Sequence, residues 1–121
     1  MTQAASGSIR LRGRSFDALG FEPDAPLSAY PDGDVTVIGS VVSGADVIAA
    51  GSIHIYGALR GRAFAGAEGK AQSRILCRRL EAELIAVGGV FLTADEIPTN
   101  VRGQAVQAWL EQDSIRIARL D

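Results

Sequence analysis

The sequence has few of the residues on which catalytic and metal sites usually depend. It contains one histidine, His54, and one cysteine, Cys77, among 121 residues. A single cysteine excludes an internal disulfide and favours a reducing compartment. No second histidine, cysteine pair or carboxylate cluster is spaced to bind a metal ion, and no nucleophile elbow or phosphate-binding loop is present. We therefore expect neither an enzyme nor a cofactor-binding protein.

Long apolar runs are also missing. No stretch is long enough, and free enough of glycine, to span a bilayer. The first eight residues carry no apolar run typical of a signal peptide, so the expected location is the cytoplasm. Aromatic residues make up only 6% of the chain, which predicts a core built from Val, Ile, Leu and Ala.

The charge is small and unevenly distributed. The net charge of −2 argues against nucleic-acid binding by the chain as a whole. Residues 60–79 nevertheless contain six basic residues and a single acid, Glu68. Such a local basic segment indicates either a specific anionic partner or a solvated edge, and both alternatives stay open.

What the sequence does contain is an internal repeat. The stretches 33–51, 51–69 and 72–89 share one apolar frame: a shift of 18 aligns Val35 with Ile53, and a further shift of 20 aligns Ile55 with Ile75 and Gly57 with Cys77. This period is too short for a helical-hairpin repeat but suits one turn of a β-solenoid, in which stacked turns bury continuous apolar columns. The sequence therefore predicts an all-β fold.

The frame also predicts individual elements. We expect strands at 35–38, 41–42, 46–49, 53–56, 62–65, 74–77, 82–86 and 90–92. The inward columns should contain Ile53, Ile55, Ile75 and Leu84, with His54 pointing outward and Cys77 a small buried thiol.

Two parts of the frame need further interpretation. Residues 78–87 are rich in helix formers and carry Leu80, Leu84 and Val87 at helical spacing, so a helix is the alternative there, although the repeat favours a strand. Residues 101–110 and 114–120 should form a closing hairpin that caps the open end of the solenoid.

The chain divides into two parts on this interpretation. Residues 1–32 should form an N-terminal hairpin, at about 9–21, followed by a proline-containing linker, and residues 33–121 should form the solenoid domain.

Residues 45–66 carry a family resemblance. They read Ala-Asp-Val-Ile-Ala-Ala-Gly-Ser-Ile-His-Ile-Tyr-Gly-Ala-Leu-Arg-Gly-Arg-Ala-Phe-Ala-Gly. This run resembles the C-terminal domain of the MinC family of bacterial septum site-determining proteins, as do 75–77, 80–84 and 104–109, and the resemblance covers about 33–121. It implies a short right-handed β-helix (β-solenoid) with a C-terminal capping hairpin, which forms a homodimer through one flat face.

The resemblance also implies partners and a location. Members of the family bind the ATPase MinD, which recruits them from the cytoplasm to the inner membrane face, and the tail of the division tubulin FtsZ, whose assembly they block away from midcell. The membrane is contacted only indirectly. By position in the family pattern, Gly44 is expected to bind MinD and Arg62 to bind the FtsZ tail, with Arg60 a weaker candidate through its proximity.

The chain departs from the family pattern before residue 33. Residues 8–27 resemble only the opening hairpin of the MinC N-terminal domain, and the family's Arg-Ser-Gly-Gln segment before the first turn is replaced by 28–34. A second hypothesis is therefore kept: a structural solenoid that self-assembles end to end, as bactofilin-type β-helices do, without binding MinD or FtsZ. An acyltransferase-type left-handed β-helix is excluded because the period is not six and His54 is alone.

Overall fold

The chain folds into two β-sheets. The computed structural model describes residues 8–11, 14–17, 33–67 and 69–120. The strands are β1 (Ser8–Leu11), β2 (Arg14–Asp17), β3 (Val35–Ile38), β4 (Asp46–Ile48), β5 (Ile53–Leu59), β6 (Arg62–Ala65), β7 (Arg74–Leu80), β8 (Leu84–Val87), β9 (Val90–Thr93), β10 (Val106–Glu111) and β11 (Ser114–Arg119). Two short 3₁₀ turns, η3 (Ala94–Glu96) and η4 (Thr99–Val101), precede β10, and the described residues contain no α-helix. The all-β class is confirmed.

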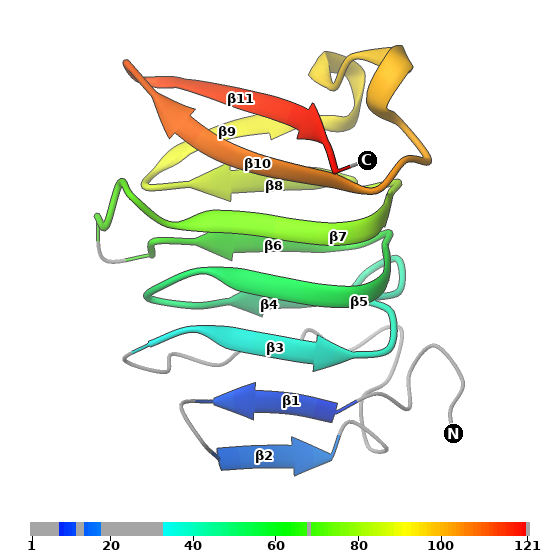
Figure 1. Cartoon of the computed structure of the whole chain (residues 1–121), viewed down its shortest axis with the longest axis vertical. Coiled ribbons are helices and arrows are strands. Elements are labelled where there is room, and N and C mark those ends of the chain that lie inside the picture. Colours follow the sequence, from blue (N-terminus) through cyan, green and yellow to red (C-terminus); the bar gives the residue numbers. More distant parts are fainter. Residues whose placement is uncertain (1–7, 12–13, 18–32, 68, 121) are drawn as a thin grey trace.

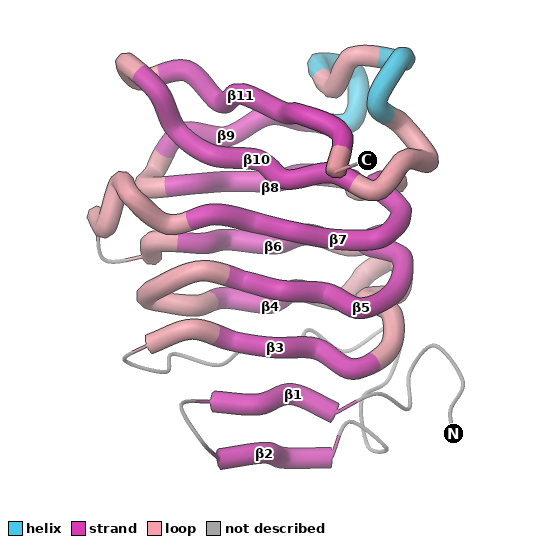
Figure 2. The backbone as a smooth tube through the Cα atoms, viewed as in Figure 1, coloured by secondary structure: helices cyan, strands magenta, loops and turns pink. Residues whose placement is uncertain are grey.

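The strands alternate between the two sheets. The seven-stranded sheet has the order β11-β10-β7-β5-β3-β1-β2, and the four-stranded sheet has the order β4-β6-β8-β9. From β3 to β8 each strand lies in the opposite sheet from the one before it, and strands one turn apart pair in parallel. Figure 1 shows the resulting stack, and Figure 2 shows the chain passing from one sheet to the other at every turn.

The core lies between the sheets and contains aliphatic side chains. Ile53, Ile55 and Ile75 are at most 2% exposed, as expected of inward columns. The inward position expected for Leu84 is wrong. Leu84 pairs with Arg62 on the outer face, and the next residue, Ile85, is fully buried in its place. Because side chains alternate along a strand, an error of one residue moves a side chain to the opposite face.

The register between turns differs in part from the expected one. The first shift of 18 is confirmed, since Val35 pairs with Ile53. The second shift is 22 rather than 20 at the start of β5, so Ile53 pairs with Ile75, and Cys77 lies beside Ile55 instead of at the place of Gly57. An irregularity between Ile55 and Ala58 then reduces the shift to 21 at the end of the strand. The connection at 66–73 is longer than the corresponding one at 49–52, which accounts for the larger shift. Because side chains alternate along a strand, a register error of two residues leaves the same side chains facing the core.

Cys77 and His54 lie as expected. Cys77 is buried, and desolvation raises the pKa of its thiol to about 12, which keeps it protonated and unreactive at neutral pH. His54 alternates with two buried isoleucines and is half-buried on the outer face of the seven-stranded sheet.

The helix suggested for 78–87 is absent. Residues up to Leu80 continue β7, and β8 begins at Leu84. The closing hairpin begins later than expected, because Val101 lies in η4 and the strand starts only at Val106. This hairpin extends the seven-stranded sheet, with β10 antiparallel to β7.

At the other end of the same sheet, β1 pairs antiparallel with both β2 and β3. Most of the linker expected before residue 33 lies outside the described residues, and the division into two parts remains a prediction. Within the part of the chain that the structure describes, no helix is long and apolar enough to cross a membrane.

Candidate partner-binding site

Arg62 opens β6 on the outer face of the four-stranded sheet. Its neighbour Ala63 is fully buried, so alternation along the strand turns the arginine outward, where its side chain is 44% exposed. The Nε of Arg62 donates to Oδ1 of Asp46 at 2.7 Å, and its Nη2 donates to Oδ2 at 3.0 Å. The parallel pairing of β4 with β6 puts Asp46 beside it. The guanidinium therefore already binds one carboxylate in the bidentate geometry that Arg forms with acidic groups.

Gly44 lies in the turn that leads into β4, next to Arg62. The glycine is exposed and has a φ of +87°, a conformation that side-chain-bearing residues rarely adopt. The backbone of Arg62 donates to the carbonyl of Ala45 at 2.9 Å, which ties this turn to β6. A Cβ on Gly61 would collide with the carbonyl oxygens of Ala45 and Val42, so the close approach of turn and strand needs glycine there. The structure thus brings Gly44 and Arg62 onto neighbouring backbone segments.

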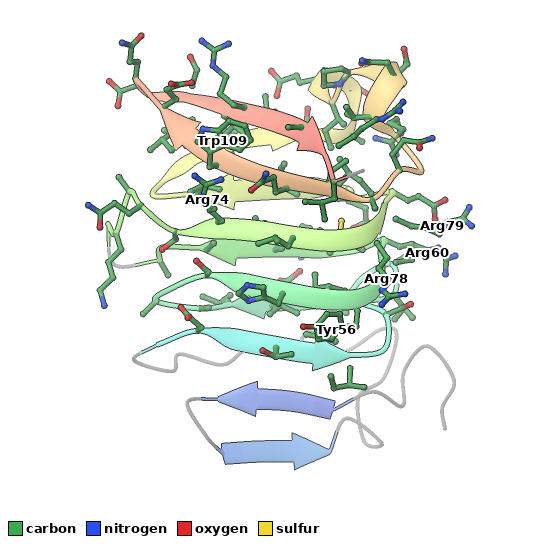
Figure 3. All side chains as sticks on the ribbon, in the orientation of Figure 1. Tyr56, Arg60, Arg74, Arg78, Arg79 and Trp109 are labelled. Atoms are coloured by element: carbon green, nitrogen blue, oxygen red, sulfur yellow. The ribbon has the colours of Figure 1, made fainter. Side chains whose placement is uncertain are left out.

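Arg60 belongs to a different cluster. Its Nε donates to Oε1 of Glu81 at 2.8 Å, while Nη2 of Arg79 donates to Oε2 of the same carboxylate at 3.2 Å. These hydrogen bonds, first from Arg60 and then from Arg79, lower the pKa of the Glu81 carboxyl below its ordinary value. Figure 3 shows Arg60 and Arg79 at the same edge of the stack, near the ends of β5 and β7. Arg60 is therefore a neighbour of Arg62 in sequence but shares no carboxylate with it.

The outer face of the seven-stranded sheet carries a second candidate surface. A cavity of about 630 Å³ lies there, lined by His54, Ile55, Tyr56, Leu76, Cys77, Arg78, Ala105 and Leu120. Tyr56 is 55% exposed and Leu120 45% exposed. The guanidinium of Arg78 lies 5.9 Å from the centre of the Tyr56 ring, within reach of a cation–π contact. This face is mainly apolar, which suits contact with another protein surface.

The sequence did not predict the two carboxylates that organise these arginines. Asp46 lies 16 residues before Arg62, whereas the repeat aligned residues 18 apart. Glu81 lies 21 residues after Arg60. In the four-stranded sheet, β4 and β6 pair at a separation of 16 residues, which places Asp46 beside Arg62. The apolar frame gave only the separation of 18 found between β3 and β5 of the other sheet.

The described residues contain no group of three or more His, Cys, Asp and Glu side chains that could hold a metal ion. The features that the structure brings together are paired charges, apolar outer faces and a tight turn. These features can bind a peptide or a protein surface.

Comparison with known proteins gives the chain a family. The model of the septum formation inhibitor MinC, C-terminal domain, matches residues 27–120. The probable septum site-determining protein MinC of Rhizobium meliloti is 62% identical over 92 residues, which cover 76% of this chain and 37% of that protein. The protein of the same name from Bradyrhizobium diazoefficiens is 54% identical over 92 residues, which cover 76% of this chain and 40% of the relative.

A solved structure shares the fold. The MinC:MinD cell division protein complex of Aquifex aeolicus matches with a TM-score of 0.67 and 25% identity, covering 80% of this chain and 87% of the matched chain. The chain thus spans less than half the length of the two curated relatives named above. The chain therefore belongs to the MinC septum formation inhibitor family, through that family's C-terminal domain.

Proposed function

We propose that the chain is a regulator of division-site selection that acts as a binding adaptor. The two relatives that are 54% and 62% identical over 92 aligned residues are named as probable septum site-determining proteins. The observation that carries the proposal is the half-exposed Arg62 guanidinium, which pairs with Asp46 on the outer face of the four-stranded sheet, next to the Gly44 turn. Exposed forks of this kind suit recognition of acidic protein segments.

MinD is the first proposed partner. The matched solved structure is a complex of MinC with MinD, and the match covers 80% of the present chain. We assign the MinD contact to the surface around Gly44, as the family resemblance implies. Binding to MinD would bring the protein to the inner membrane face.

The acidic tail of FtsZ is the second proposed partner, with Arg62 as its main contact. The half-exposed position of Arg62 supports this assignment, because Asp46 accepts from two of the five guanidinium N–H donors and the others can donate to a peptide carboxylate. Arg60 is the weaker candidate, because it belongs to the separate Arg60–Glu81–Arg79 cluster and was assigned only through its proximity to Arg62 in the sequence.

The proposal also includes a right-handed β-helix fold and a homodimer. The alternation of strands between two sheets, with parallel pairing one turn apart, supports a helical course of the chain. The apolar cavity around Tyr56 and Leu120 supports a homodimer through the outer face of the seven-stranded sheet. A two-fold contact of one face with its own copy is the commonest way to cover such a surface.

The alternative of a self-assembling scaffold has less support. Along the seven-stranded sheet the described strands begin and end in antiparallel hairpins, β1–β2 and β10–β11. End-to-end growth needs strand edges that continue the parallel stack, and hairpins at both ends of this sheet oppose it.

The test is a pair of binding measurements on the purified chain. MinD with ATP should retain the protein in a pull-down, and MinD with ADP should retain less. A fluorescent FtsZ tail peptide should show raised anisotropy that falls with increasing salt. Filaments of the chain alone, with neither partner bound, would favour the scaffold.

A further inference from the structure

A surface groove lies beside the Arg62–Asp46 pair, on the outer face of the four-stranded sheet. Its volume is about 320 Å³. Asp46 lies at one end, and Ala67 and Gly89 lie at the other. The residues that line it are Asp46, Ile48, Phe64, Ala65, Ala67, Ala86 and Gly89. The lining is apolar except at the end where Arg62 holds Asp46.

Strand register explains why this groove is apolar. Ile48 pairs with Phe64, Phe64 with Ala86, and Ala86 with Phe91, so one row of apolar side chains crosses all four strands. Alternation along β6 turns Phe64 to the same outer face as Arg62, two residues earlier. A charged fork and an apolar row therefore lie side by side on one face.

The spacing of these two features matches an extended peptide. Residues two apart on a strand are separated by about 6.6 Å, since a strand rises about 3.3 Å per residue. A peptide lying along β6 in extended conformation repeats this spacing, with side chains two apart facing the same way. We propose that the groove receives an apolar side chain of an extended acidic peptide, two residues from the carboxylate that pairs with Arg62. This inference rests on the proposed function, because it assigns a second contact to the same site.

The Asp46 pair is the reason that such a second contact is needed. Arg62 has a carboxylate partner within the chain, so a peptide carboxylate must share or replace Asp46. Exchanging Asp46 for a peptide carboxylate on the half-exposed Arg62 guanidinium therefore gives little net gain in free energy. An apolar side chain that leaves water for the groove adds a favourable contribution that Asp46 cannot match. The groove would thus discriminate between acidic peptides that the guanidinium alone binds alike.

The chain offers variants that separate the groove from the fork. Phe64→Ala removes apolar lining, and Ala86→Gln narrows the groove without removing a large packed side chain. Phe91→Ala is the matched control, because Phe91 belongs to the same outward row and is 58% exposed but does not line the groove. Thermal melting by circular dichroism establishes which variants fold. Ala86→Gln keeps the test available if Phe64→Ala is unstable.

The probe is the fluorescein-labelled FtsZ tail peptide, together with forms in which each apolar residue is replaced singly by alanine. We expect Phe64→Ala and Ala86→Gln each to weaken binding about five- to tenfold with an unchanged salt dependence, and Phe91→Ala to change it less than twofold. One alanine form of the peptide should bind the parent chain as weakly as the unaltered peptide binds the Phe64→Ala variant. Combining that peptide with Phe64→Ala should lower the affinity little further, because both changes remove the same contact.

Two results would overturn the inference, and they differ. If the groove variants bind as the parent does while Arg62→Ala loses affinity, the groove is not used and the proposed function stands. If the parent chain does not bind the tail peptide even at low salt, the inference and the proposed FtsZ contact both fail.

Discussion

At the scale of single residues, Arg62 and Arg116 differ in the burial of the carboxylates that hold them. The Nε of Arg62 lies 2.7 Å from a carboxylate oxygen of Asp46, whose side chain is only 16% exposed. By contrast, Arg116 and Glu111 form a longer pair at 3.3 Å, in which both side chains are more than half exposed. The guanidinium of each pair is exposed, so each pair should contribute about 0–1 kcal/mol to stability, with the Arg62 pair toward the upper end because Asp46 is largely buried. Neither arginine should be needed for folding.

Replacing Arg62 should therefore affect binding more than stability. We expect Arg62→Ala to weaken FtsZ tail binding about tenfold or more, since a charge-assisted contact contributes about 1.5–3 kcal/mol when it is desolvated. Arg62→Lys should restore binding only in part, because an ammonium group lacks the planar fork. Fluorescence anisotropy at several salt concentrations gives the affinities, and differential scanning calorimetry should show little change in Tm.

The matched control for this prediction is Arg116→Ala, which removes an exposed guanidinium from the other sheet. It should leave tail binding unchanged. Equal losses on both substitutions would mean that net charge, rather than the Arg62 fork, governs the affinity.

Glu81 predicts a dependence of stability on pH. Hydrogen bonds from Arg60 and Arg79 lower the pKa of its carboxyl in the folded chain. A lowered folded-state pKa means that the stabilisation is fully present above the ordinary glutamate pKa, about 4.3, and is lost as the pH falls through the folded-state value. Glu81→Gln should therefore lose less stability than the parent when urea unfolding is compared at pH 7 and pH 3. Because the Glu81 side chain is partly exposed to solvent, the difference should be small and should shrink in 1 M salt.

The control is Glu83→Gln, which removes an exposed carboxylate two residues along the chain. Its acid sensitivity should follow that of the parent. Parallel curves for the parent and Glu81→Gln would show that the Arg60–Glu81–Arg79 cluster contributes nothing to folding.

At the scale of the elements, the close approach of the Gly44 turn to β6 depends on Gly61. The φ of this glycine is not positive, so its need for glycine comes from space alone. A Cβ there would collide with the carbonyl oxygens of Ala45 and Val42, the latter at 2.6 Å. We expect Gly61→Ala to destabilise the fold by about 1–3 kcal/mol, as overpacking does. It should also move the turn away from Arg62 and weaken MinD and tail binding together.

Gly69→Ala is the comparison that separates space from conformation. Gly69 has a φ of +88° but no atom within 4 Å of an added Cβ. Its substitution should cost about 1–2 kcal/mol through backbone strain alone and leave binding unchanged. Chemical unfolding gives both free energies. If Gly61→Ala binds the tail peptide and MinD with the affinities of the parent, the Gly44 turn is not linked to the binding site.

The elements also show how far the sequence alone can be interpreted. Strands at 35–38 and 62–65 were predicted with their observed ends, because alternating apolar residues and flanking glycines are local signals. The register between β5 and β7 was not, since it depends on the length of the connection at 66–73. In β8 four apolar residues follow one another, so alternation could not tell Leu84 from Ile85.

The candidate site was predicted less completely than the fold for a related reason. Arg62 and Gly44 were identified by resemblance to a family pattern, and residue spacing alone gave them no special role. Asp46 and Glu81 acquire their roles only through contacts between turns, at 16 and 21 residues of separation. A frame built on apolar residues carries no information about which charged side chains meet across an outer face.

At the scale of the whole molecule, the two outer faces have different characters. The four-stranded sheet carries the Arg62 fork and the narrow groove beside it. The seven-stranded sheet carries the wider cavity, where Tyr56 is 55% and Leu120 45% exposed, with Ile38 also 45% exposed. If the wider apolar face pairs with its own copy, the two Arg62–Asp46 pairs of the dimer lie on the four-stranded sheets, outside that contact.

This arrangement predicts a dimer that depends on one face only. The parent chain should sediment as a dimer at tens of micromolar, because an apolar face of this kind gains free energy when it leaves water. Tyr56→Asp should shift it toward a monomer of 12.7 kDa, since a two-fold contact would put a carboxylate and its desolvation cost at the interface twice. Phe91→Asp places the same charge on an equally exposed aromatic position of the other sheet and should leave the dimer intact. Sedimentation equilibrium distinguishes these states, with circular dichroism confirming that both variants fold. A parent chain that stays monomeric would contradict the predicted dimer. A dimer that is lost on Phe91→Asp and kept on Tyr56→Asp would place the contact on the four-stranded sheet instead.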